Sequence, residues 1–429
     1  MKKAIACYMP NSKLGYRDLK NSNIIGSLKE RFNVKSIFSD IEETSLFGND
    51  VKNIITNNNN LRFHLWSIFF ELSNFKYYRE KIGASQAFPL LGMSFYKRII
   101  IRIIIKLNLI SFFSFLLRNI LIISSPRYDD DLLGSDFLLA FTSSKDLIFD
   151  DLIRCANRNK IRVGLVLINW DNASSKPYLE KPDIVFTWGI QTANLSKSIH
   201  GITSKEIGSP RFNVYKNTKY IDKQMLKHRY NLNDNHDYIL YAGASFPSND
   251  VKVLNQLSKI ITDKYESKYR IIYRPHPHAW FKNESEKNEY YNRIVIDDPI
   301  KDQSENIFEK FRDLHQLSCA LISPYSTMAV ESLINGNPIL LIGVDYNKFF
   351  RWEHNSKIAP HLKILKNKHS VIHCHSLDNI DSLFEKLIRL SKEKNTNIKS
   401  KEISEEIVLM TKKSYENILC DNLENFINN

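Results

Sequence analysis

The strongest constraint on the fold is an alternation of short apolar runs and helical patterns between Tyr238 and Gly343. The segments YILYAGAS (238–245), IIYRPHPH (271–278) and ALISPYS (320–326) each pass from apolar residues into small or polar residues. Such alternation is typical of βαβ units and of a parallel sheet. Because ligands bind at the carboxyl ends of strands in such sheets, the polar residues at these ends are the candidate functional residues.

The first half of the chain carries the same kind of pattern. Apolar runs of strand length alternate there with longer stretches of helical spacing, so we predict a second parallel sheet. The predicted strands of this half are Ala4–Tyr8, Val34–Phe38, Asp136–Phe141, Arg162–Ile168, Pro182–Trp188 and Ser204–Ile207.

The length of 429 residues is that of two to three domains of about 150 residues each. A polar and charged stretch, Asn213–Asp237, separates the two α/β patterns. We therefore predict an N-terminal domain over residues 1–220 and a C-terminal domain over 221–399. Residues 400–429 have helical spacing of apolar residues, and we expect this helix to pack back on the N-terminal domain.

Composition narrows the class of partner. The formal net charge is +13, but lysine and arginine are spread along the chain without a long basic block, so nucleic acid is not the expected partner. The five cysteines lie far apart, which suits a reducing cytoplasm. Cys374 stands between His373 and His375, but no second pair of ligands follows at short spacing, so a zinc site is not predicted.

The most apolar segment of the chain is Lys97–Ser124. Its longest uncharged run, Leu107–Leu117, has eleven residues, well short of the roughly 20 that span a bilayer. Arg98, Arg102, Lys106 and Arg118 recur near helical spacing with no acidic residue among them. Two interpretations stay open: a cationic amphipathic helix on an anionic membrane face, or a core helix with cationic stems along one edge.

Hydroxyl residues follow the predicted strand that ends at Ile322. Ser326 and Thr327 stand where a helix begins, and the start of a helix offers free N–H groups to a phosphate. Glu331 comes one turn later, where its carboxylate could accept hydrogen bonds from ribose hydroxyls. Plain capping of the helix by Ser326, with Glu331 as its capping partner, is the alternative.

A turn rich in proline follows the strand that ends at Tyr273. In Arg274-Pro275-His276-Pro277 the prolines fix the backbone, so Arg274 and His276 could both donate hydrogen bonds to a phosphate. Gly243 and Ser245 follow the neighbouring predicted strand, in a tight loop where backbone can approach a ligand closely.

The Arg-Pro-His-Pro turn and the Ser-x-x-Ser-Thr…Glu…Gly-x-Pro pattern about 50 residues later resemble the donor half of GT-B glycosyltransferases. The similar families are bacterial surface-polysaccharide enzymes with an HP motif and a serine motif: sialyltransferases, Kdo transferases and CDP-glycerol glycerophosphotransferases. UDP-GlcNAc 2-epimerase is similar in the serine pattern and shares the fold. The resemblance implies an α/β, GT-B-like chain with two Rossmann-like domains that face a central cleft.

The resemblance also implies roles for individual residues. His276, Ser326 and Thr327 would hold the donor phosphate, with Thr327 in the place of a second serine, and Glu331 would bind the ribose. The N-terminal domain would supply the acceptor side and a catalytic carboxylate, for which Asp171 is the candidate, as base or as nucleophile. Its neighbours Asn169, Trp170 and Asn172 could bind a sugar, and Arg211 would line the hinge or meet an acidic donor or acceptor. An Asx turn is the structural alternative for Asp171.

We therefore predict a glycosyltransferase of bacterial capsule or lipopolysaccharide biosynthesis, with CMP-Kdo as the favoured nucleotide-sugar donor and a glycan or glycolipid as acceptor. No Asp-x-Asp motif stands at a strand end, so no metal or other cofactor is expected. The expected location is the cytoplasm, with peripheral contact at the inner face of the cytoplasmic membrane left open. The alternatives are a CDP-polyol phosphotransferase with histidines in place of Asp171, a UDP-sugar 2-epimerase, and a non-catalytic assembly subunit.

Overall fold

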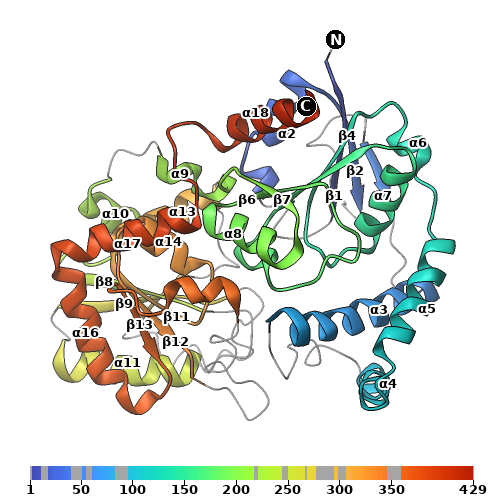
Figure 1. The fold of residues 1–429 in the computed structure, drawn as a ribbon. Helices are drawn as coiled ribbons and strands as arrows, with labels where there is room; N and C mark the ends of the chain where they lie inside the picture. The colour runs from blue at the N-terminus through green and yellow to red at the C-terminus, as the bar shows by residue number, and fades with distance from the viewer. Residues whose placement is uncertain are drawn as a thin grey trace. The chain divides into compact units, whose positions relative to one another are not determined.

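The computed structural model describes residues 2–10, 18–39, 51–54, 60–82, 95–216, 221–243, 250–265, 268–276, 294–297, 306–344 and 359–428. The chain forms two compact units (Figure 1). Unit 1 contains Met1–Arg211, Ile358–His361 and Lys413–Asn429, and unit 2 contains Phe212–Lys357 and Leu362–Lys412.

Unit 1 is built on a seven-stranded sheet in which every neighbouring pair is parallel. All six residues of its central strand β4 are buried, as expected for a strand covered on both faces. In sheet order the strands are β3 (Val51–Ile54), β2 (Asn33–Ser39), β1 (Ala4–Pro10), β4 (Phe137–Thr142), β5 (Arg162–Leu167), β6 (Ile184–Thr187) and β7 (Thr203–Glu206).

The helices around this sheet include the C-terminal one. Helix α18 (Tyr415–Asn428) packs on α2 (Ile24–Arg31), and Arg31 Nη1 lies 2.7 Å from Asp421 Oδ1. The other helical segments near the sheet are α6 (Asp129–Leu132), α7 (Leu147–Arg158), η4 (Trp170–Ala173), α8 (Ile190–Leu195), η5 (Ser196–His200) and η6 (Pro210–Phe212).

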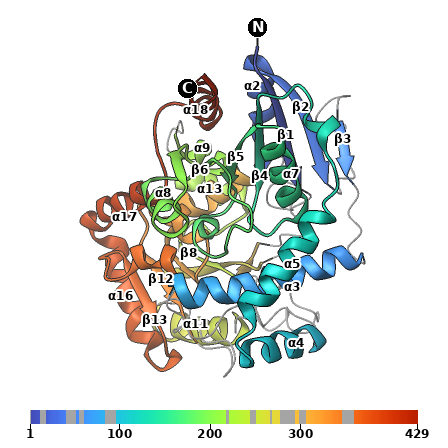
Figure 2. The same ribbon diagram turned by 45° about the vertical axis from the view of Figure 1, so that its right-hand side comes forward.

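Three further helices of unit 1 form a group beside the sheet (Figure 2). Helices α3 (Leu61–Tyr77), α4 (Phe95–Lys106) and α5 (Ile110–Ile123) share an apolar core that includes Trp66, Ile104 and Leu117, and the short η2 (Tyr78–Ile82) continues α3. Trp66 Nε1 donates to Asp150 of α7 at 2.8 Å. The group is thereby tied to the sheet layer through a buried hydrogen bond.

The single amphipathic helix considered for Lys97–Ser124 is in fact two helices. Asn108 stands between α4 and α5 with a left-handed φ of 54°. Leu109 N donates to Ile104 O at 3.0 Å and so closes the end of α4. Asparagine tolerates this conformation better than most residues, which explains why the chain turns at this position.

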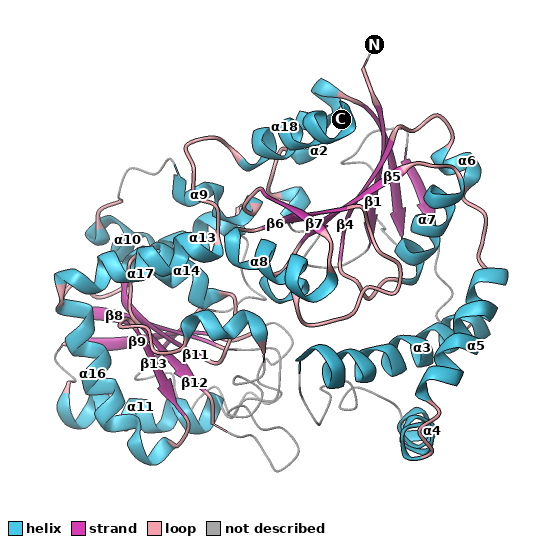
Figure 3. Cartoon of the chain, viewed as in Figure 1, coloured by secondary structure: helices cyan, strands magenta, loops and turns pink. Residues whose placement is uncertain are grey.

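Unit 2 has a six-stranded sheet, again parallel in every pair (Figure 3). In sheet order its strands are β10 (Ile294–Ile296), β9 (Tyr269–Arg274), β8 (Asp237–Ala242), β11 (Ser318–Ser323), β12 (Ile339–Ile342) and β13 (Val371–Cys374). Its helical segments are α9 (Asn213–Lys216), α10 (Lys223–Arg229), α11 (Asp250–Lys264), α13 (Ile307–Leu317), α14 (Met328–Ile334), η8 (Leu377–Asn379), α16 (Ile380–Lys392) and α17 (Lys394–Ile407). The short η7 (Pro360–Leu365) begins in unit 1 and ends in unit 2.

Helices α11 and α16 pack with the strands of unit 2 in one apolar core, which includes Leu254, Tyr273 and Phe384. Because every strand runs in the same direction, their carboxyl ends meet at one edge of the sheet. The predicted parallel α/β organisation is confirmed in both halves of the chain, and the residues at this edge of unit 2 can be compared directly.

Candidate functional site

The carboxyl edge of the unit 2 sheet brings together the ends of β8 and β9. An added Cβ at Gly243 would lie 2.6 Å from Asp250 Oδ2 and 3.1 Å from the backbone nitrogen of His276. Residue 243 must therefore be glycine, because Asp250 and the His276 backbone approach it too closely to leave room for a side chain. Asp250 in turn accepts hydrogen bonds from Tyr241 Oη at 2.9 Å and Tyr273 Oη at 3.1 Å. The predicted neighbours Gly243 and His276 are adjacent, whereas Ser245 and Pro277 lie outside the described residues.

Arg274 is held rigidly at the end of β9. It is buried, it forms an ion pair with Asp297 at the end of β10, and its guanidinium carbon lies 4.7 Å from the centroid of the Phe311 ring. Lys310 Nζ lies 2.7 Å from the other oxygen of Asp297. Arg274 and Lys310 thus both contact the carboxylate of Asp297 at this strand end.

The serine loop, Ser323–Thr327, connects β11 to α14. Thr327 occupies the cap position of α14 but its hydroxyl makes no capping hydrogen bond. The hydroxyl oxygens of Ser323 and Ser326 are buried, with no hydrogen-bond partner among the residues that the structure describes. The capping role considered for Ser326 is thus not observed, and its hydroxyl can bond to a ligand oxygen.

Glu331 lies on α14, fully buried rather than at the rim of the edge. Tyr215 Oη donates to Glu331 Oε2 at 3.1 Å, and His315 Nε2 is 4.0 Å from the same oxygen. Burial lowers the pKa of His315 to about 3, so its ring is neutral near pH 7. Tyr215 and His315 are partners that the sequence analysis missed, since neither lies in a motif.

The His-Cys-His sequence at the end of β13 has a structural explanation. His373 Nε2 lies 3.3 Å from Leu365 O, and because a carbonyl can only accept, Nδ1 is left to accept from Tyr325 Oη at 2.9 Å. Burial lowers the pKa of His373, which keeps the ring in this neutral form. Over the described part of the chain, no three histidine, cysteine or acidic side chains are grouped as metal ligands.

The loop predicted to be catalytic in unit 1 follows β5. Asp171 is partly buried, and its backbone oxygen accepts from Ser174 N at 2.9 Å and from Ser175 N at 2.8 Å. Asn172 Oδ1 accepts from Asn169 N at 3.0 Å, and Trp170 Nε1 donates to Gln191 Oε1 at 2.7 Å. The side chains of Asn172 and Trp170 therefore hold the loop in shape.

His361 lies against this loop, although it is nearly 190 residues further along the chain. Its ring centroid is 5.2 Å from that of Trp170, and its Nδ1 is 3.4 Å from Ser174 Oγ. Gln191 Nε2 donates to the backbone oxygen of His361 at 2.7 Å, which fixes the position of the residue. Burial lowers the pKa of His361, while the negative charge of Asp171 acts in the opposite direction. No local sequence signal marks His361 as part of this site.

Arg211 lies in unit 1, where its guanidinium carbon is 6.0 Å from the centroid of the Trp188 ring. Trp188 is fully buried, and its Nε1 donates to Leu167 O at 2.9 Å. Arg211 therefore lies over the ring of Trp188, which is hydrogen-bonded to the end of β5, the strand that the Asp171 loop follows.

Comparison with known proteins places these residues in a family. The profile described as CDP-Glycerol:Poly(glycerophosphate) glycerophosphotransferase matches residues 191–407, half of the chain. The match includes the end of β9, the serine loop, Glu331 and His361. No protein in the curated set matches the sequence.

Solved structures resemble the whole chain at low identity. The calicheamicin glycosyltransferase CalG4 is 9% identical with a TM-score of 0.55, over 100% of this chain and 98% of that one. The putative UDP-N-acetylglucosamine 2-epimerase from Listeria monocytogenes is 10% identical with a TM-score of 0.54, over 100% and 98%. MnaA from S. aureus, solved with UDP, is 12% identical with a TM-score of 0.52, over 100% and 97%.

At these identities the structural likeness is evidence of fold alone. It confirms the GT-B-like α/β architecture that the sequence predicts, in which two parallel-sheet domains occur in one chain. The family match adds that the chain is a transferase.

Proposed function

The chain belongs to the CDP-glycerol:poly(glycerophosphate) glycerophosphotransferase family, and we propose that it transfers a polyol phosphate from a CDP-activated donor to a hydroxyl group of a phosphate-containing surface polymer. The observation that carries the proposal is the family match across the carboxyl edge of the unit 2 sheet. Arg274 and His276 lie there at the end of β9, and Ser326 follows β11, with β8 between these two strands. It favours the CDP-polyol alternative over the CMP-Kdo donor, for which the only support is the resemblance of short motifs.

The proposed step balances as a phosphoryl transfer. The acceptor oxygen attacks the phosphorus atom next to the polyol, and a new P–O bond forms there. The bond from that phosphorus to the bridging oxygen breaks, and CMP leaves with the bridging oxygen. The proton of the acceptor hydroxyl passes to a base on the enzyme.

In this proposal unit 2 binds the donor. Ser326 and Thr327 supply hydroxyl donors to the diphosphate, and His276 bonds to the same group from the end of β9. Arg274 and Lys310, which both contact Asp297, are the cations proposed to stabilise the charge that grows on CMP as it leaves. Glu331, held by Tyr215, accepts from the ribose hydroxyls.

His361 and Asp171 form the proposed base in unit 1. A neutral imidazole can accept the proton of a hydroxyl, and the adjacent carboxylate stabilises the imidazolium that results. Burial lowers the pKa of His361 and so favours the neutral ring, whereas Asp171 acts in the opposite direction and favours the imidazolium, and both effects fit this role. Asp171 is thus a positioning residue in the proposal, and His361 takes the proton.

The test is a donor panel with the purified chain, an oligomeric glycerol phosphate acceptor, and CDP-glycerol, CMP-Kdo or UDP-GlcNAc. The released nucleotide is quantified by chromatography. We expect CMP release from CDP-glycerol alone, and a loss of at least 100-fold in His276→Ala and His361→Ala, with Lys20→Gln as a matched surface control. Release from CMP-Kdo but not from CDP-glycerol would instead support the sugar-transfer prediction and reject the phosphotransferase.

We also propose that α4 and α5 bind an anionic membrane face. Residues 81–128 contain seven lysines and arginines and no acidic residue. Large apolar side chains are exposed on both helices, among them Ile103 at 51%, Phe112 at 60% and Phe115 at 69%. Arg118 Nη2 lies 3.7 Å from Glu180 Oε2. The exposed apolar side chains and the excess of basic residues in this segment suit an interfacial helix pair. Within the described residues, no helix combines the length and the apolar character needed to cross a bilayer.

Vesicle co-sedimentation tests this contact. We expect binding to phosphatidylcholine vesicles that contain phosphatidylglycerol, and weaker binding to phosphatidylcholine alone. Phe112→Ser with Phe115→Ser should reduce partitioning about 100-fold, from about 1.5 kcal/mol for each buried phenylalanine. The matched control is Ile398→Ser, an equally exposed apolar residue on α17. Equal partitioning of the double variant and the control would reject the membrane contact.

A further inference from the structure

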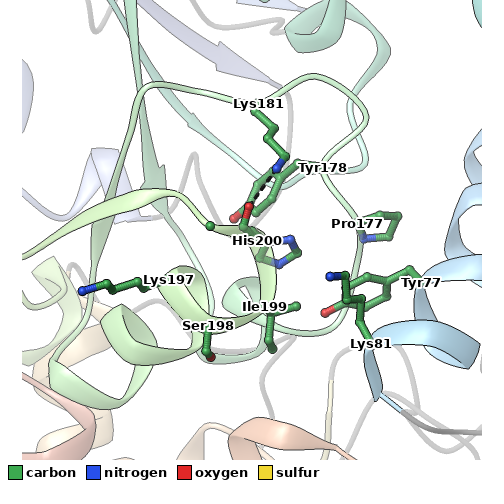
Figure 4. A pocket seen from close by; sticks show the side chains of 10 residues that line it. Tyr77, Lys81, Pro177, Tyr178, Lys181, Lys197, Ser198, Ile199 and His200 are labelled. Carbon is green, nitrogen blue, oxygen red and sulfur yellow. Dashed lines mark hydrogen bonds between the residues drawn. The ribbon is translucent and has the colours of Figure 1, made fainter.

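A cavity of about 370 Å³ lies in unit 1. Figure 4 shows side chains from three segments around it: Tyr77 and Lys81 from the end of the α3–η2 helix, Tyr178 and Lys181 from the loop before β6, and His200 from the end of η5. The volume is that of a small-molecule site. The group of helices formed by α3, α4 and α5 thus contributes one wall.

The aromatic side chains form a rigid floor. The rings of Tyr77 and His200 are stacked, with centroids 5.6 Å apart and an angle of 4°. Tyr178 meets the same histidine edge-on at 4.5 Å. His200 Nε2 lies 3.2 Å from Ala173 O, so this nitrogen carries the proton and Nδ1 is an acceptor. A polyol chain could lie against these ring faces and donate a hydroxyl to Nδ1.

The charge on the cavity walls is positive. Lys81, Lys181 and Lys197 all line it, and none of the described residues around it is acidic. None of these three ammonium groups has a carboxylate partner among the residues that the structure describes. Lys181 Nζ donates to His200 O at 2.8 Å, whereas Lys197 extends away from the other labelled side chains in Figure 4. The charges of Lys181 and Lys81 both help to lower the pKa of His200, although burial is the larger cause.

The cavity is connected directly to the Asp171 loop. Tyr77 Oη donates to Ser174 O at 2.7 Å, and Tyr78 Oη donates to Ser175 O at 2.9 Å. His200 bonds to Ala173 of the same loop. The floor of the cavity and the loop that carries Asp171 are therefore connected by hydrogen bonds. A ligand in the cavity would lie beside the loop that carries Asp171, which the proposed function assigns to the acceptor.

We propose that this cavity binds a phosphate group of the acceptor, with the adjoining polyol against the rings of Tyr77 and Tyr178. The inference rests on the proposed function, because it assigns to the acceptor a second contact point apart from the reacting hydroxyl. Such a contact would favour acceptors that already carry a phosphate over a free polyol. The same chemistry occurs in a soluble polyol phosphate chain and in the headgroup of phosphatidylglycerol.

The test is calorimetric binding of sn-glycerol 3-phosphate to the full chain without donor. We expect millimolar binding that weakens as salt is raised, and no binding of glycerol. Lys81→Gln with Lys181→Gln should weaken binding about tenfold, since each exposed cation contributes modestly. Lys20→Gln, an exposed lysine of unit 1 outside the cavity, should bind as the wild type does. Unchanged thermal midpoints would confirm that both variants are folded.

Two results would overturn the proposal. One is equal affinity of the double variant and the wild type for glycerol 3-phosphate. The other is no binding of glycerol 3-phosphate at 10 mM, a concentration about tenfold above the expected dissociation constant. Competition separates the two sources of phosphate: displacement by phosphatidylglycerol vesicles assigns the site to a lipid headgroup, and its absence assigns it to the polymer. Because no nucleotide is present, failure here is distinct from failure of the donor panel. A chain that binds glycerol 3-phosphate but releases no CMP would keep the site and reject the phosphotransferase.

Discussion

Replacing Gly243 by alanine perturbs the contact that brings the ends of β8 and β9 together. The added methyl group would stand 2.6 Å from Asp250 Oδ2, about 1 Å closer than an ordinary contact. Asp250 cannot withdraw freely, because Tyr241 and Tyr273 donate to its two oxygens from buried positions. We expect the overpacking to lower the free energy of unfolding of unit 2 by about 1–3 kcal/mol.

The same substitution should affect the donor. The His276 backbone nitrogen is 3.1 Å from the added atom, so the Arg-Pro-His turn must shift as well. In the proposed function this turn binds the diphosphate, and a shift of this size should weaken CDP affinity about tenfold or more. Urea unfolding measures the first effect and calorimetric titration with CDP the second.

Two controls make the reasoning refutable. Gly134→Ala also introduces a methyl group, but at a left-handed φ of 76° with open space around it, so it should cost about 1 kcal/mol of stability and leave CDP affinity unchanged. In an Asp250→Ala background, Gly243→Ala should cost less than half of what it costs in the wild type, because the crowded oxygen is gone. Full additivity of the two substitutions, or wild-type stability and CDP affinity in Gly243→Ala, would show that the close contact is not what constrains this edge.

Two further predictions concern protonation. Burial lowers the pKa of His200 from 6.5 to about 4, so the unfolded chain takes up the proton first as pH falls. The free energy of unfolding therefore falls by up to about 3 kcal/mol between these two pH values. His200→Gln should lack this loss in urea unfolding measured at pH 7 and pH 5, and equal losses in both proteins would contradict the assignment. The charge of Asp171 raises the pKa of His361, so Asp171→Asn should move the acid limb of the pH profile of kcat/KM to lower pH. The plateau rate should fall in the same variant. An acid limb that does not move would exclude His361 as the base that Asp171 assists.

Most strands were predictable because they are buried on both faces, whereas the short, partly exposed edge strands β3 and β10 were not predicted. β4 and β12 are continuous apolar runs that sequence periodicity marks clearly, and their polar ends pointed to the functional edge of the sheet. The break between α4 and α5 was not predicted, since it depends on one residue, Asn108, in a left-handed conformation. Among the asparagines that the structure describes, three have a positive φ, namely Asn108, Asn231 and Asn367, so the residue type alone does not predict the break.

The side chains around the candidate site were less predictable than the strand ends. Tyr215 reaches Glu331 across 116 residues of sequence, and Asp297 reaches Arg274 across 23, so neither pair leaves a local pattern. His361 is a further case, because it meets Trp170 only through the tertiary fold. Such contacts require the structure, whereas Arg274 and His276 could be chosen from the prolines that surround them.

The most direct test of the central claim follows the phosphorus atom next to the polyol. CDP-glycerol labelled with ³²P at that position is incubated with the enzyme and an oligomeric glycerol phosphate acceptor, and the polymer and nucleotide fractions are separated and counted. The phosphotransferase account predicts that the label enters the polymer and that unlabelled CMP is released. Label that stays in released CDP would mean that the bond to the polyol carbon breaks, as in glycosyl transfer, and would contradict the account.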